Sequence, residues 1–124
     1  MIISETWIGG REAEEDIKNV LSSGHGIGMI ARNRRSRGGG IAILYKEGLI
    51  KLSEHRFRRE NNELVAASGK INGLQRPVFI FALYIKPSLP AHKKKQMLES
   101  VVDAVLEIET KHQNPIICIG GDFN

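Results

Sequence analysis

The sequence closes on Gly121-Asp122-Phe123-Asn124, which places a carboxylate and a carboxamide two positions apart. These residues follow the apolar run 115–119, which is too short for a helix and typical of a buried strand. A carboxylate accepts protons, whereas a carboxamide donates hydrogen bonds to an anionic oxygen without repelling it. The pattern predicts a polar site at the end of a strand. A plain strand-ending turn, which favours the same residue types, is the alternative.

Two further segments carry candidate chemistry. Glu5 lies in Ser4-Glu5-Thr6-Trp7, and carboxylate oxygen is the ligand that a hard ion such as Mg²⁺ prefers. Tyr84 ends an apolar run and is followed by Pro87. Taken alone, Glu5 is compatible with a surface residue and Tyr84 with a core tyrosine whose hydroxyl is satisfied.

Together these segments resemble the endonuclease/exonuclease/phosphatase superfamily, and within it the endonuclease domain of non-LTR (LINE-type) retrotransposons. The resemblance implies that Glu5 binds the divalent metal, Mg²⁺ or alternatively Mn²⁺. It implies that Asp122 orients or deprotonates the attacking water, that Asn124 hydrogen-bonds the scissile phosphate, and that Tyr84 lies near that phosphate. The Tyr-x-x-Pro spacing at 84–87 is longer than the family's usual Tyr-x-Pro.

The activity that the resemblance implies is Mg²⁺-dependent hydrolysis of a DNA phosphodiester. DNA is then the partner, a reverse transcriptase domain is expected in the parent polyprotein, and no small-molecule cofactor is evident. The location would be intracellular, and nuclear if the target is chromosomal DNA. Two alternatives stay open: a phosphatase of the same superfamily, or a non-catalytic remnant of a decayed element.

Positive charge supports a polyanionic partner. The net charge is +4 and the pI about 9.4, and four arginines fall between positions 32 and 37, before Gly38-Gly39-Gly40. Arg34, Arg35 and Arg37 are candidate contacts to the DNA backbone, although a solvated loop would have the same composition. No Gly-Lys-Ser/Thr follows, so the segment is not a phosphate-binding P-loop. Lys93, Lys94 and Lys95 crowd the first turn of a predicted helix, where cations are unfavourable.

The elements that must position these residues follow from hydrophobic periodicity. Helices are predicted over 12–22 and 92–110, the second with one broad apolar stripe: Leu98, Val101, Val102, Val105, Leu106 and Ile108. Strands are predicted over 26–32, 41–45 and 116–119, with an edge strand within 49–57. A hairpin over 63–71 and 76–85 turns at Asn72-Gly73. Runs 41–44, 78–85 and 116–119 are apolar on both faces, so helices should cover one side of the sheet and a second apolar layer, such as another sheet, the other side.

The expected fold class is therefore α/β: the N-terminal half of a two-sheet β-sandwich flanked by helices, as in the endonuclease/exonuclease/phosphatase fold. Residues 1–124 would form a partial domain that lacks the family's first strand and its C-terminal half with the Ser-Asp-His motif, and we expect such a fragment to be inactive alone. The single cysteine, Cys118, cannot form an internal disulfide and is expected to be a buried packing residue. No apolar run approaches the ~18 residues that span a bilayer, so no membrane association is expected.

Overall fold

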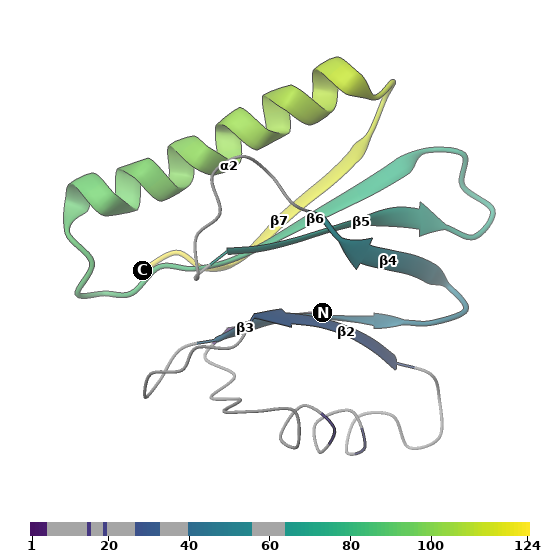
Figure 1. The fold of residues 1–124 in the computed structure, drawn as a ribbon, viewed down its shortest axis with the longest axis horizontal. Helices are drawn as coiled ribbons and strands as arrows, with labels where there is room; N and C mark the ends of the chain where they lie inside the picture. Colours follow the sequence, from purple (N-terminus) through teal and green to yellow (C-terminus); the bar gives the residue numbers. More distant parts are fainter. Residues whose placement is uncertain (5–14, 16–18, 20–26, 33–39, 56–63) are drawn as a thin grey trace.

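Two β-sheets are stacked face to face, and a long helix covers the outer face of the larger sheet (Figure 1). The computed structural model describes residues 1–4, 15, 19, 27–32, 40–55 and 64–124. The helix expected over 12–22 lies outside these residues, except for positions 15 and 19. The described elements are β1 (Ile2–Ser4), β2 (Ile27–Arg32), β3 (Ile41–Lys46), β4 (Ile50–Glu54), β5 (Leu64–Ile71), β6 (Pro77–Tyr84), α2 (Ala91–Lys111) and β7 (Ile116–Asp122).

The smaller sheet has the order β1-β3-β2, and both of its strand pairs are antiparallel. Its central strand β3 is apolar over 41–44, and these residues are buried. One row of this sheet has Ser4, Ile41 and Arg32 side by side. At the end marked by this row, Glu5 follows β1, and the arginine-rich segment leaves β2.

The larger sheet has the order β4-β5-β6-β7, in which β6 and β7 are parallel and the other pairs antiparallel. The predicted hairpin is confirmed as β5 and β6. Its turn follows the Asn72-Gly73 signal, because Gly73 has φ 81° and the N–H of Leu74 donates to the carbonyl of Ile71 at 3.0 Å. The predicted edge strand within 49–57 is β4, which lies at the edge of the described sheet.

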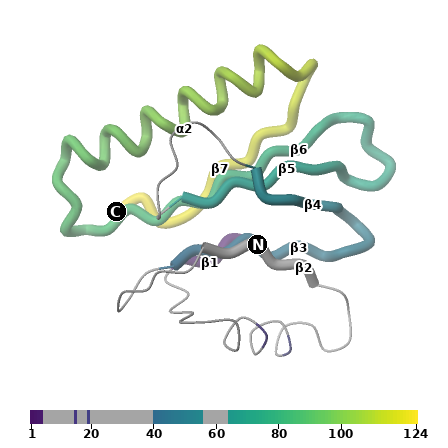
Figure 2. The backbone as a smooth tube through the Cα atoms, viewed as in Figure 1, coloured from purple at the N-terminus to yellow at the C-terminus, as the bar shows by residue number. Residues whose placement is uncertain are grey.

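A short turn carries the chain from the smaller sheet to the larger one, between β3 and β4 (Figure 2). Gly48 in this turn has φ 86°, a backbone conformation that favours glycine. The side-chain amide of Asn72 donates to the Gly48 carbonyl at 2.6 Å, and the Asn72 N–H donates to the Leu49 carbonyl at 2.9 Å. The two turns are thereby joined at one end of the sandwich.

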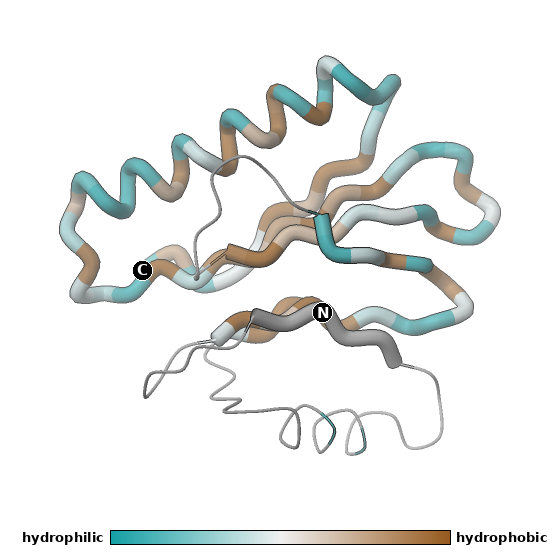
Figure 3. The backbone as a smooth tube through the Cα atoms, viewed as in Figure 1, coloured by the Kyte–Doolittle hydropathy of each residue, from teal (hydrophilic) through white to brown (hydrophobic). Residues whose placement is uncertain are grey.

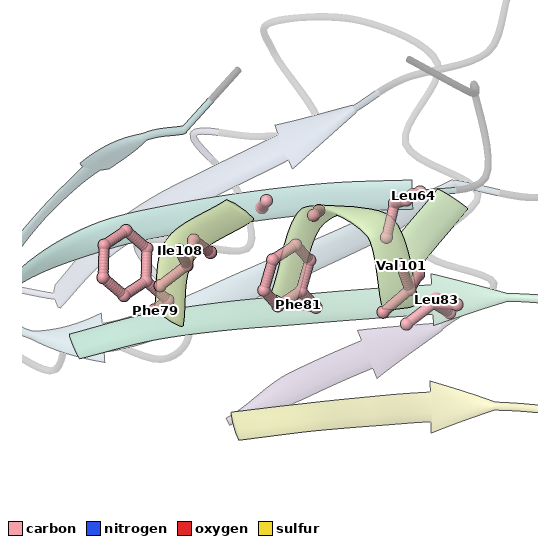
Figure 4. Packing of buried hydrophobic residues seen from close by; sticks show 8 residues of the cluster. Leu64, Phe79, Phe81, Leu83, Val101 and Ile108 are labelled. Carbon is pink, nitrogen blue, oxygen red and sulfur yellow. The ribbon is translucent and has the colours of Figure 1, made fainter. Parts of the chain in front are cut away.

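Strand β6 is apolar on both faces because it lies between two cores. Phe79, Phe81 and Leu83 belong to the cluster under α2, together with Val101 and Ile108 of the helix (Figure 4). The alternate residues Ala82 and Tyr84 belong to the cluster between the sheets, and Ile80 packs against it. Hydrophobic residues accordingly concentrate on the inner strands, while the turns are largely hydrophilic (Figure 3). The predicted second apolar layer is the chain's own smaller sheet.

Helix α2 begins after Pro90, the N-cap residue, whose φ is −55° and ψ 144° and whose side chain makes no capping hydrogen bond. The N–H groups of Lys93 and Lys94 donate to the Pro90 carbonyl at 2.9 and 3.0 Å. The helix ends at Lys111, because the backbone of His112 is extended; the N–H of His112 still donates to the carbonyl of Ile108, which completes the last helical hydrogen bond. The predicted bounds of 92–110 are therefore correct to one residue at each end.

The apolar stripe predicted for this helix was partly wrong. The residues of α2 that are buried against the sheet are Met97, Val101, Ala104 and Ile108. Leu98, Val102 and Leu106 are instead 43%, 55% and 54% exposed. The apolar arc of α2 is wider than one sheet face can cover, so the sequence pattern did not show which part of it would be buried.

The prediction for Cys118 was also wrong, because its side chain is exposed. Strand β7 pairs with β6 on one side and is the last strand of the described sheet. An apolar run at a sheet edge has fewer neighbours than the same run in the centre, and Ile119 is likewise 48% exposed. Within the described residues, no helix has the length and apolarity needed to cross a membrane.

Candidate functional site

Tyr84 and Asp122 are neighbours across the parallel pair β6 and β7, each at the carboxyl end of its strand. The N–H of Ile85 donates to the Asp122 carbonyl at 2.8 Å, which continues the ladder past the last residue of β6. Tyr84 is only 5% exposed, whereas Asp122 is half-buried. The carboxyl edge of parallel strands is where open α/β sheets present polar groups to ligands. The structure thus brings together two of the predicted site residues.

Asn124 is held beside this pair by a local hydrogen bond. Its N–H donates to Oδ1 of Asp122 at 3.2 Å, and its φ is 23°. An Asp that accepts a bond from the backbone two residues on forms an Asx turn. From the sequence, a plain strand-ending turn and a polar site were alternative interpretations of residues 121–124. The geometry is compatible with both, because the turn itself places Asp122 and Asn124 at the carboxyl edge of β7.

A basic group from α2 reaches the same edge. Nζ of Lys94 donates to the backbone oxygen of Asn124 at 3.0 Å. The first turn of α2 contains no acidic residue, and Lys93 and Lys95 flank Lys94 in sequence. In the sequence this lysine run is only a weak indication of an anionic partner, because exposed lysines in a first helical turn cost no more than tenths of a kcal/mol.

Two adjacent glycines let the backbone pack closely just before Asp122. A Cβ on Gly120 would lie 2.8 Å from Cδ1 of Ile2, so β1 approaches β7 closely at this point. A Cβ on Gly121 would lie 1.9 Å from the carbonyl oxygen of Leu83, and Gly121 also has φ 137°. The glycine pair therefore seats β7 against both β6 and β1.

A hollow of about 380 Å³ adjoins these glycines, lined by Met1, Ile2, Ser4, Ile43, Ile80, Cys118, Gly120 and Gly121. Ser4 is the residue before Glu5, and Gly121 is the residue before Asp122. The described backbone therefore brings the segments that carry the two predicted carboxylates to one side of the sandwich. Glu5 itself lies outside the described residues, as do Arg34, Arg35 and Arg37.

The oxygen donors at this edge suit a hard divalent cation, since the Asp122 carboxylate and the Asn124 amide are such donors. Among the described residues, no three His, Cys, Asp or Glu side chains gather in a group that could hold a metal. A metal site that combines Glu5 with Asp122 would include a residue outside the described ranges, because Glu5 is not among them.

Away from this edge, a cluster of rings joins β4, β6 and the end of α2. Phe79 contacts His55, with ring centroids 5.3 Å apart, and His112, at 5.0 Å. Burial lowers the pKa of His55 below 6.5, with Glu107 opposing the shift and the positive charges of His112 and Lys111 adding to it. Phe79 lies at the opposite end of β6 from Tyr84, so we assign this histidine to packing rather than to the site.

No model of a known protein family matches the chain, and no curated protein is significantly similar to it. Solved structures resemble it in fold. TDP2 from Caenorhabditis elegans aligns with 99% of the chain at a TM-score of 0.63 and 18% identity, and the chain covers 36% of that structure. For a truncated form of the same protein the TM-score is 0.64, the identity 19% and the coverage 48%. For the human nocturnin catalytic domain, solved with a bound sulfate anion, the TM-score is 0.60 and the identity 13%, and the chain covers 50% of that structure.

These neighbours have the endonuclease/exonuclease/phosphatase fold, and the two stacked sheets with α2 outside them match it. The predicted fold class is thereby confirmed. The chain spans half or less of the length of these structures.

Proposed function

We propose that the chain forms part of a metal-dependent phosphodiesterase that cleaves DNA, of the kind that non-LTR retrotransposons use as an endonuclease. The observation that carries the proposal is the pairing of Tyr84 with Asp122 at the carboxyl edge of β6 and β7, with Asn124 hydrogen-bonded to the Asp122 carboxylate. The shared fold and the family resemblance of the motifs support the same assignment. One of the fold neighbours is a catalytic domain with bound sulfate, an anion similar in shape to phosphate.

In this proposal Asp122 orients the attacking water and accepts its proton. The Asn124 N–H bonded to Oδ1 fixes the carboxylate, so its orientation is set before substrate arrives. The Asn124 side chain donates to a phosphate oxygen, and Tyr84 lies close to the same phosphate. Burial of Tyr84 restricts its ring to one position, which is what a positioning group requires.

Glu5 is the proposed metal ligand. Ser4, the residue before Glu5, lines the same hollow as Gly121, the residue before Asp122, and this supports a shared site for the two carboxylates. When bound there, Mg²⁺ would neutralise charge on the phosphoryl oxygens and stabilise the leaving 3′-oxygen.

The DNA backbone is the proposed partner of Arg34, Arg35 and Arg37. The row Ser4–Ile41–Arg32 supports this, because the arginine segment leaves β2 at the end of the smaller sheet from which the chain continues to Glu5. The proposal includes a reverse transcriptase domain in the parent polyprotein and a nuclear location. It also includes a domain of the neighbours' length, of which these residues form one half.

Nicking of supercoiled plasmid in Mg²⁺ tests the proposal, with a domain of the neighbours' length that contains this chain. Asp122→Asn keeps the shape but removes the proton acceptor, so activity should fall about 10²–10⁴-fold and excess metal should not restore it. Glu5→Gln should also lose activity, but regain part of it as Mg²⁺ is raised. Glu47→Gln, an exposed carboxylate in the β3–β4 turn, is the matched control.

The 124-residue chain by itself should not nick above background. Nicking that survives Asp122→Asn would refute the assignment of the site. Release of inorganic phosphate from a phosphomonoester, without nicking, would indicate the superfamily phosphatase instead. Turnover of neither substrate would indicate a non-catalytic remnant.

A further inference from the structure

Arg76 clamps the connection between α2 and β7. It directly precedes β6, and its guanidinium donates to both oxygens of Asn114, two residues before β7. Nε donates to the backbone carbonyl at 2.8 Å, and Nη2 donates to Oδ1 at 2.9 Å. Nη2 also donates to the carbonyl of Pro115 at 3.4 Å. A guanidinium presents its donors in a fixed fork, so one side chain holds three oxygens of this connection in a defined position.

Asn114 has a backbone conformation that few residues adopt. Its φ is 52°, in the left-handed region, where asparagine is enriched among the residues other than glycine. The chain then passes through Pro115 and enters β7 at Ile116. An unusual backbone conformation persists only where its surroundings hold it, and here the surroundings include the fork of Arg76.

The position at which the chain enters β7 decides which residues of β6 and β7 are neighbours. Val78 lies beside Ile116 at the start of the pair, and the same register places Tyr84 beside Asp122 at its end. A shift by one residue would turn the Asp122 side chain to the other face, and a shift by two would move it about 6–7 Å along the strand. Side-chain burial specifies this register only weakly, because β7 contains two adjacent glycines and none of its residues is buried in this chain.

We propose that Arg76 is a positioning residue for the candidate site: by holding Asn114 it fixes the register of β7 on β6, and so places Asp122 beside Tyr84. The clamp lies at the opposite end of the two strands from the site, so Arg76 acts through β7 and not on the reacting groups. Its effect on the register concerns the fold alone, whereas its effect on turnover rests on the proposed nuclease function.

Oxidative crosslinking of the 124-residue chain measures the register directly. Cys118 is the only cysteine, its neighbour on β6 is Ile80, and both line the same hollow. Neighbouring strands are about 4.8 Å apart, within the range for a disulfide, so Ile80→Cys should form one with Cys118. Val78→Cys and Ala82→Cys each lie two positions from that register and should form little.

Loss of the clamp should change this pattern. Arg76→Ala and Arg76→Lys should each slow crosslinking in the Ile80→Cys chain about tenfold, the equivalent of one charge-assisted hydrogen bond, and should speed it in at least one of the two shifted chains. Lysine keeps the charge but cannot form the fork. Asn114→Asp keeps an acceptor for Arg76 and tolerates positive φ, so it should retain the register. Lys70→Ala is the matched control, because Lys70 is an exposed cation beside Pro77, on the side of β6 away from β7, and should leave the pattern unchanged.

In a domain of the neighbours' length, only molecules in the native register should nick plasmid DNA. Arg76→Ala should therefore lower kcat in proportion to the fraction in register and leave KM unchanged. Equal crosslinking of the Ile80→Cys chain with and without Arg76 would overturn the proposal, as would shifted chains that gain nothing or an Ile80→Cys chain that never crosslinks. Loss of native circular dichroism in Arg76→Lys would also overturn it, because the residue would then support the fold as a whole. A domain that does not nick even with Arg76 present would refute the nuclease assignment instead, and the crosslinking would still decide the register.

Discussion

Replacement of Gly121 by alanine tests how β7 is seated, and with it the geometry of the candidate site. Two costs are expected at this position. The φ of 137° is a conformation that L side chains rarely adopt, which costs about 1–3 kcal/mol. In addition, the new Cβ would lie 1.9 Å from the carbonyl oxygen of Leu83, so the backbone of one strand must shift. Overpacking of this kind costs about 1–3 kcal/mol, and occasionally more.

Two other glycines separate these contributions. Gly73 has φ 81° but nothing within 4 Å of a Cβ, so Gly73→Ala measures backbone strain alone, about 1–2 kcal/mol. In Gly69→Ala the Cβ would meet the Lys51 carbonyl oxygen at 1.8 Å without a positive φ, so it measures displacement of a neighbouring strand alone. In Gly120→Ala the Cβ would meet only the end of the Ile2 side chain, which can rotate, and the cost should be at most about 1 kcal/mol.

The summed expectation for Gly121→Ala is about 2–6 kcal/mol, a large part of the total stability of a small domain. At about 4 °C per kcal/mol, the Tm should fall by roughly 8–24 °C. Urea unfolding of the four variants, followed by circular dichroism, provides the free energies. A cost for Gly121→Ala no greater than that for Gly73→Ala would refute the close seating of β7 on β6, and with it the pairing of Asp122 with Tyr84.

Three further predictions concern Cys118, His55 and the arginine-rich segment. Cys118 is exposed, so a thiol reagent should label the native chain at nearly the rate of the urea-unfolded chain; protection in the native state would contradict its edge position. Burial lowers the pKa of His55 in the folded state below 6.5. The free energy of unfolding should therefore be unaffected by His55 above pH 6.5 and should fall as the pH drops from 6.5 towards that lower pKa. His55→Asn should remove this pH dependence, and an unchanged pH dependence would show that another group causes it. Replacing Arg34, Arg35 and Arg37 by alanine, in a domain of the neighbours' length, should weaken binding to duplex DNA of any sequence. The slope of log K against log salt concentration should become shallower by about 0.9 for each phosphate contact that is lost. The matched control replaces Lys51 and Lys70, an exposed pair in register near the opposite end of the larger sheet, and should leave the slope unchanged.

Local patterns in the sequence determined most of the described elements. Asn72-Gly73 predicted the hairpin turn because a turn needs a residue that tolerates positive φ, and Gly73 has it. Apolar residues on both faces of 78–85 predicted two covering layers, and β6 lies between α2 and the smaller sheet. Asp122 and Asn124 became candidates through their types and their position at a strand end, and the family resemblance of the motifs added Tyr84.

Only the tertiary structure decided which of these features meet. The parallel register that pairs Tyr84 with Asp122 joins strands separated by the whole of α2, and no local pattern encodes such a register. Apolarity shows that a side chain is compatible with burial, but burial depends on neighbours far away in the chain. Cys118 and Val102 are exposed for this reason: β7 has no described strand on its outer side, and α2 has an apolar arc wider than the sheet beneath it.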